Sequence, residues 1–124
     1  MKMTVQQVFN AHRALTSIID AGRPLPQKGA YRLARMHAKL KVEFDPIAAK
    51  YDALLIEHAA PVPDTVPQRY SFTPEFNTAW SEIADDEIDV AVEPIPLSIL
   101  DLGDSVAGAI KASELIALGE LVTE

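Results

Sequence analysis

The stretch from residue 26 to residue 59 carries an apolar repeat that constrains the fold more than any other feature of the chain. Its members recur at spacings of three and four, so they share one face of a helix. They are Ala30, Leu33, His37, Leu40, Phe44, Ile47, Tyr51, Leu54 and His58. The register does not shift at Pro46. We therefore expect one helix from Pro26 to Ala59, kinked near Pro46, whose missing N–H leaves the carbonyl of Val42 without its usual donor.

Asp45 and Pro46 also allow a different interpretation, in which one helix ends and another begins. Aspartate is a common N-cap residue, and proline is favoured at the first helical position. A loop at Asp45 would tend to shift the register of the repeat. The unbroken register favours a continuous helix, and a break at Asp45 remains the alternative.

A second set of apolar side chains lies on the opposite face of the same predicted helix. It consists of Ala38, Val42, Ala49, Ala53 and Ile56. A helix with two apolar faces needs two partners. An N-terminal helix can cover one face, and either the C-terminal half or another copy of the chain must cover the other. Coverage within the chain is the more economical expectation, and the candidate residues for binding a partner are Val42, Ala49, Ala53 and Ile56.

The N-terminal residues predict an amphipathic helix over residues 4–21. Thr4 and Gln7 have the spacing of a capping box. The apolar face that follows consists of Val5, Val8, His12, Leu15 and Ile19. Gly22 and two prolines then predict a short connection, which is typical of antiparallel helices.

The C-terminal half predicts shorter elements after a proline-rich connection over residues 60–72. Thr73 and Pro74 are typical of a helix start, and the helix would bury Phe76, Trp80 and Ile83. Residues 88–93 alternate between apolar and polar positions, as in a half-buried strand. We expect residues 69–72 to be the antiparallel partner of that strand.

The last residues predict one more short helix. Ser113 is the expected N-cap, and Leu115, Leu118 and Val122 are the expected buried positions. A single helical turn is expected at Leu97–Leu100. The fold class is therefore α+β and mostly α, with one domain over residues 1–124. It comprises a long helical hairpin (1–59), the connection (60–72) and a small lobe (73–124) with a two-stranded antiparallel element and two short helices.

Composition and charge bound the class of protein. The chain has 124 residues and no cysteine, which excludes disulfides and thiolate metal sites. No apolar run is long enough to span a membrane, and the N-terminus lacks the apolar core of a signal peptide, so we expect a cytosolic protein. Residues 1–50 hold nine Lys/Arg and three Asp/Glu, whereas residues 51–124 hold two and fifteen. The two halves are therefore electrostatically complementary.

The residues provide no positive signal for catalysis or for a cofactor. No glycine-rich phosphate loop and no GxSxG turn are present. His37 and His58 would lie about 30 Å apart on one helix, so they cannot share a metal ion within one chain. His12 can approach one of them across the hairpin, but two histidines alone do not make a metal site. We expect each histidine to lie at the edge of the apolar seam with a ring nitrogen bonded to a neighbour.

Two charged clusters are candidate binding surfaces. The basic cluster, Lys28, Arg32, Arg35 and Lys39, lies on one helical face and can contact phosphates or an acidic protein surface. The net charge of −7 favours the protein partner over nucleic acid, and simple solvation of the cluster is favoured over either partner. The acidic cluster consists of Asp85, Asp86, Glu87, Asp89 and Glu93. These carboxylates do not converge as the ligands of a hard cation do, so a solvated surface is the simpler interpretation.

The segment "LPQKGAYRLARMHAKLKVEFDPIAAKYDALL" resembles a segment of small, mostly uncharacterised proteins encoded by tailed bacteriophages. The resemblance extends to "FNTAWSEIADDEIDVAVEPIPLSILDLGD" and "ASELIALGELVTE". It departs at Pro46, where the family's helix usually runs unbroken. It implies a phage protein that works in the host cytoplasm or within the virion without enzymatic activity.

The leading functional hypothesis is binding to another phage protein or to a second copy of the chain, in virion assembly or as an adaptor. The first alternative is an inhibitor of a host defence system or nucleic-acid enzyme, with the acidic cluster as a mimic of phosphates. The second alternative is a nucleic-acid-binding module that uses the basic cluster.

Overall fold

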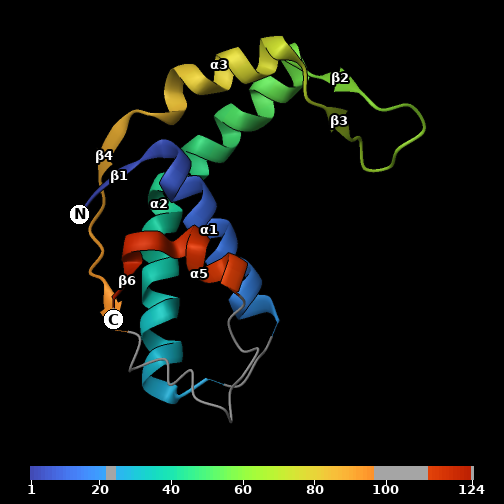
Figure 1. Cartoon of the computed structure of the whole chain (residues 1–124). Coiled ribbons are helices and arrows are strands. Elements are labelled where there is room, and N and C mark those ends of the chain that lie inside the picture. The colour runs from blue at the N-terminus through green and yellow to red at the C-terminus, as the bar shows by residue number, and fades with distance from the viewer. Residues whose placement is uncertain (22–24, 97–111, 124) are drawn as a thin grey trace.

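The computed structural model describes residues 1–21, 25–96 and 112–123 (Figure 1). Its elements, in chain order, are β1 (Lys2–Thr4), α1 (Val5–Asp20), α2 (Gln27–His58), β2 (Ala60–Pro61), β3 (Tyr70–Ser71), α3 (Pro74–Ala84), β4 (Glu87–Asp89), β5 (Ile95–Pro96), α5 (Ala112–Leu118), the 3-10 helix η2 (Gly119–Leu121) and β6 (Val122–Thr123). The expected class is confirmed: the chain is mostly helical, with a long α1–α2 hairpin and small two-stranded sheets. The expected turn at Leu97–Leu100 lies outside the described residues.

The start of α1 is fixed by the capping box that the sequence predicts. The Thr4 hydroxyl accepts a hydrogen bond from the Gln7 backbone N–H at 3.1 Å, and the Gln7 side chain accepts one from the Thr4 N–H at 2.8 Å. These bonds satisfy two donors that a helix start otherwise leaves unpaired. Four of the five positions predicted for the apolar face of α1 are buried. The exception is Ile19, which is 42% exposed, whereas its neighbour Ile18 is buried.

The second helix, α2, runs without interruption from Gln27 to His58 with Pro46 inside it. The continuous helix is confirmed, and the alternative with Asp45 as an N-cap is wrong. In Figure 1 the axis of α2 changes direction in its C-terminal half, in agreement with the expected kink near Pro46. We call the apolar repeat between residues 30 and 58 of α2 the inner stripe. It faces the core over most of its length, with Leu33, Leu40 and Leu54 buried, whereas Ala30 is exposed.

The main core lies where α1 packs on α2 and where α5 and η2 cover α1. Its fully buried side chains are Val8, Leu15, Ile18, Leu33, Leu40, Leu118 and Leu121. Burying a side chain of this size contributes about 1.5–3 kcal/mol. With few aromatic residues in the chain, aliphatic contacts hold this end of the hairpin together.

A second cluster, rich in aromatic rings, joins α3 to the C-terminal half of α2. Tyr51 makes edge contacts with Phe76 at 5.3 Å and with Trp80 at 5.0 Å between ring centroids. The Phe9 ring of α1 lies 4.8 Å from the Tyr51 ring and 5.4 Å from the Trp80 ring. The Trp80 indole N–H also donates a 2.6 Å hydrogen bond to Gln6. These contacts place α3 against both helices of the hairpin.

Thr73 caps α3 and also ties the start of α3 to the end of α2 by a hydrogen bond. Its hydroxyl donates to the His58 carbonyl at 2.6 Å and accepts from the Phe76 N–H at 3.2 Å. The predicted start of α3 is therefore confirmed, with Thr73 as the N-cap and Pro74 in the first turn.

The predicted strand pairing is wrong. The segment at residues 69–72 supplies β3, which pairs with β2 and not with the strand at residues 88–93. Of the predicted strand, only residues 88 and 89 lie in β4, and residues 90–93 are not in a strand. The strand β4 pairs antiparallel with β1, so that Met3 lies opposite Ile88. The alternation itself is confirmed, because Val90 and Val92 are buried whereas Asp89, Ala91 and Glu93 are exposed. The sequence did not predict β1, because its three residues end at the helix cap Thr4 and are too few to show an alternating pattern.

At the C-terminal end, β5 pairs with β6 in parallel, with Ile95 opposite Val122. Ser113 is wrong as an N-cap, since it lies within α5. Leu118 is buried and Val122 half-buried, as expected, while the Leu115 side chain lies outside the description. Gly119 follows α5 with φ of 54°, a conformation that favours glycine at a helix end.

Replacing Pro46 with alanine is expected to stabilise the chain. The change restores an N–H that can donate to the Val42 carbonyl within α2, and the free energy of unfolding should rise by up to about 3 kcal/mol. Urea denaturation followed by circular dichroism measures the change. The matched control is Ala53→Pro at another exposed position of α2, which should lower stability by about 3 kcal/mol. A Pro46→Ala variant less stable than the parent would contradict this account of the kink.

Candidate functional site

The face of α2 turned away from α1 presents uncovered apolar side chains. We call Ala38, Val42, Ala49, Ala53 and Ile56 the outer face. All five are exposed, and the exposed fractions of Val42 and Ile56 reach 73% and 70%. Within the described residues no element covers this face, contrary to the expectation of coverage by the chain itself. The reason is geometric: α1 and α3 pack on the inner stripe of α2, which lies on the opposite side of the helix.

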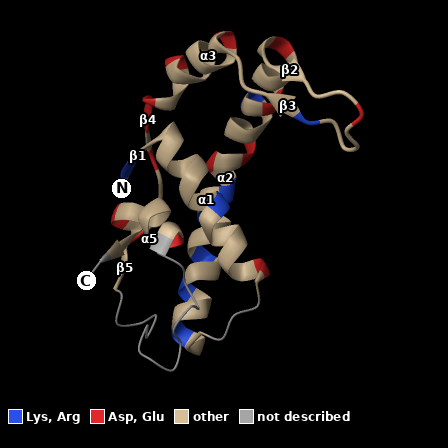
Figure 2. Ribbon diagram, turned by 45° about the vertical axis from the view of Figure 1, so that its right-hand side comes forward, with Lys and Arg blue, Asp and Glu red and all other residues tan. Residues whose placement is uncertain are grey.

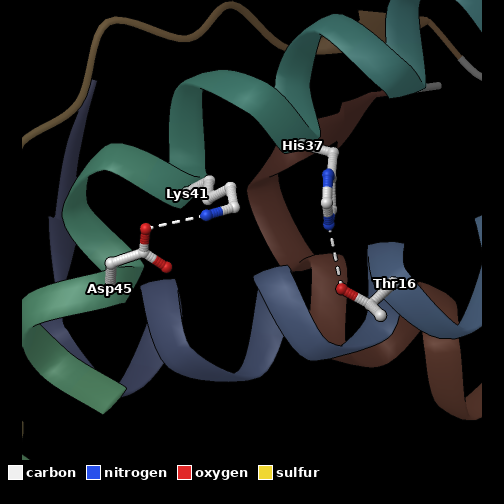
Figure 3. Close-up of polar contacts among 4 residues, drawn as sticks. All are labelled: Thr16, His37, Lys41 and Asp45. Atoms are coloured by element: carbon white, nitrogen blue, oxygen red, sulfur yellow. Dashed lines mark hydrogen bonds and ion pairs between the residues drawn. The ribbon is translucent and has the colours of Figure 1, made fainter. Parts of the chain in front are cut away.

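Charged side chains border the outer face. Lys41 and Asp45, one helical turn apart, form an ion pair with 2.8 Å between nitrogen and oxygen (Figure 3). Both side chains are more than half exposed, so this pair contributes only about 0.3–0.5 kcal/mol to stability. The side chains that border the outer face are therefore solvated charges, which can exchange ion-pair partners at little cost in free energy.

The basic cluster Lys28, Arg32, Arg35 and Lys39 is fully exposed on α2. Within the described residues, none of these four side chains has a carboxylate at ion-pair distance. Figure 2 shows Lys and Arg spread along the N-terminal half of α2. The cluster therefore keeps its positive charge free for a partner.

Three members of the basic cluster, Arg32, Arg35 and Lys39, line a hollow of about 230 Å³. Its other wall is formed by the segment 92–95, which includes the exposed Glu93. Sequence reasoning found the cations but missed the hollow, because nothing in the sequence shows that residues 92–95 lie beside α2. A carboxylate in the wall makes this hollow a mixed-charge site.

The acidic cluster extends from the C-terminal end of α3 through β4 to Glu93. Asp85, Asp86, Glu87, Asp89 and Glu93 are all exposed. Asp85 and Asp86 follow α3, and β4 then directs Glu87 and Asp89 outward while Ile88 turns inward. Figure 2 shows Asp and Glu at the end of α3 and in β4. Among the described residues, no three His, Cys, Asp or Glu side chains are grouped so that they could hold a metal ion.

The structure brings together two of the three histidines. The His12 ring of α1 stacks between the His37 and Phe44 rings of α2, with centroid distances of 4.4 Å and 3.9 Å. His12 is buried, and neither of its ring nitrogens has a hydrogen-bond partner among the described residues. The expectation of a bonded ring nitrogen is therefore wrong for His12, which is held by stacking.

Thr16 links His37 to the backbone of α1. The Thr16 hydroxyl is 2.9 Å from the His12 carbonyl oxygen and 2.9 Å from His37 Nε2 (Figure 3). An Nε2–H of His37 that donates to this hydroxyl would satisfy both hydrogen bonds. The expectation of a bonded ring nitrogen is confirmed for His37. His58 lies at the far end of α2, with its Nε2 3.7 Å from a Glu57 oxygen.

Comparison with known proteins adds no relative: no protein-family model, no curated protein and no solved structure gives a match to this chain. None of the helices in the described part of the chain combines the length and the apolar character needed to cross a membrane. The candidate site therefore follows from the geometry alone, and the outer face of α2 carries two of the large exposed apolar side chains, Val42 and Ile56.

Burial lowers the pKa of His12 below its ordinary value of 6.5, and the nearby His37 and Lys41 lower it too, against an opposing effect of Asp45. The unfolded chain thus binds a proton on His12 at a higher pH than the folded chain does. In that window the unfolded state holds more protons, so stability falls as the pH drops through 6.5 toward the lowered pKa.

We expect His12→Phe to remove most of the pH dependence of unfolding in this window. Phenylalanine preserves the ring stack but cannot bind a proton. Urea denaturation at a series of pH values between about 7.5 and 5 measures the slope. The control His58→Gln should retain it. An unchanged slope in the His12→Phe variant would show that protonation of His12 is not its source.

Proposed function

We propose that this chain works by binding another protein through the outer face of α2, and not by catalysing a reaction. The carrying observation is the exposure of Val42 and Ile56 on the same face, 14 positions apart on one continuous helix. Four helical turns separate them, so the face extends about 21 Å along the axis. Apolar side chains aligned over such a length favour contact with a complementary helix.

The structure of α2 supports this use in a second way. A partner that docks along a helix needs a rigid surface, and α2 is anchored over its inner stripe by α1 and α3. The kink at Pro46 does not interrupt the outer face, because Val42 and Ala49 lie on either side of it and are both exposed. The contact surface is therefore preorganised, which reduces the entropy lost on binding.

The biological setting that we propose rests on the sequence resemblance to tailed-phage proteins. In that setting the chain is a virion assembly protein or an adaptor to another phage protein, in the host cytoplasm or within the particle. The acidic cluster makes inhibition of a host enzyme the second candidate, since its five carboxylates are all exposed. The basic cluster ranks below both, because Glu93 lies in the wall of its hollow and the chain is acidic overall.

A photoreactive amino acid at position 42 or 56 tests the proposed surface. We expect both positions to cross-link to protein when the chain is produced during infection by the virus that encodes it. The control is position 66, where the Val66 side chain is 99% exposed but lies away from α2. Cross-links at position 66 alone, or at none of the three positions, would contradict the proposal. Cross-links from Asp86 or Asp89 to a host enzyme would favour the second candidate.

A further inference from the structure

The charges along α2 are segregated by sequence position. Residues 27–42 contain five Lys or Arg and no Asp or Glu, whereas residues 43–58 contain four Asp or Glu and one Lys. The helix is thus positive in its first half and negative in its second. Such a helix is complementary to itself only when two copies run antiparallel, because a parallel pair would place like charges together.

From this complementarity we infer that the partner of the outer face is a second copy of the chain, with the two α2 helices antiparallel across a two-fold axis near Asp45. The inference rests on the proposed function and names its partner. An isologous contact of this kind uses the same surface on both copies and closes as a dimer.

The side-chain sizes on the outer face define a register for this pairing. When Val42 faces Ala49 of the second copy, Ala38 faces Ala53, and the symmetry repeats both contacts. Each valine then meets a small side chain, so the helices can approach closely without a clash. All four residues are exposed in the structure and require no rearrangement of the fold.

The same register brings opposite charges together at the border of the outer face. Arg35 lies beside Glu57 of the second copy, and Lys41 beside Asp52. All four side chains are exposed and lie within one helical turn of the apolar contacts. Exposed pairs contribute only about 0.2–1 kcal/mol each, so they fix the orientation more than the affinity. Lys41 already bonds Asp45 and can exchange or share that partner.

The absence of cysteine from the sequence permits a direct test by disulfide cross-linking. We expect a mixture of the Val42→Cys and Ala49→Cys variants to form a mixed disulfide dimer on mild oxidation. The Ala38→Cys variant alone should not cross-link. Position 38 of one copy faces position 53 of the other, so the two cysteines at position 38 would lie about 22 Å apart. A disulfide requires Cα atoms within about 7 Å. A parallel dimer would instead cross-link every single variant to itself.

Charge reversal provides a second measurement that misfolding cannot imitate. Light scattering and analytical ultracentrifugation should show a dimer for the parent chain. Arg35→Glu should raise the dissociation constant about tenfold, a change of about 1.4 kcal/mol. Adding Glu57→Arg to the same chain recreates the pair with its charges exchanged and should restore the dimer.

The outcomes separate this inference from the proposed function. A monomer at every concentration, or self-cross-linking of Ala38→Cys, overturns the antiparallel dimer. If the chain is monomeric but position 42 still cross-links to a different protein, the outer face binds a partner and only the identity of that partner is wrong. If position 42 cross-links to nothing, both fail.

Discussion

The apolar seam between α1 and α2 is the contact on which the rest of the described chain depends. Leu15 and Ile18 of α1 are buried with Leu33 and Leu40 of α2 in one core cluster. That cluster also contains Leu118 and Leu121, which places α5 and η2 on the hairpin. At the other end, the Phe9 ring reaches the Tyr51 and Trp80 rings and so fixes α3. Without the seam, none of the short elements would have a surface to pack on.

The same seam explains why the outer face is left uncovered. Once α1 and α3 occupy the inner stripe, the remaining described elements pack on α1 or pair as short strands. Val42 and Ile56 are then exposed to solvent, although they lie on one face of α2 as the residues of a helix–helix contact do. The described elements thus bury only one of the two apolar faces of α2. In our proposal the other face is the binding surface.

The buried His12 shows that a polar side chain can be held in the core by ring stacking, without a hydrogen bond to its ring nitrogens among the described residues. His12 occupies a position in the apolar stripe of α1, where its ring is stacked between two rings of α2. Neither ring nitrogen has a partner among the residues that the structure describes, which costs free energy, and this cost rises further if the ring becomes charged. The stack therefore makes the hairpin sensitive to mild acid at a position that a leucine would have filled without this effect.

The sequence by itself determined the main helices, the caps at Thr4 and Thr73 and the two faces of α2, because these depend on side chains three or four residues apart. The capping box at Thr4 and the unbroken register through Pro46 are examples of such local information. Only the tertiary structure decided the strand pairs, the stacking of His12 on His37, the hollow beside Arg35 and the exposure of Val42. Each of these depends on which distant segments meet, and short strands such as Lys2–Thr4 have too few residues to specify a partner.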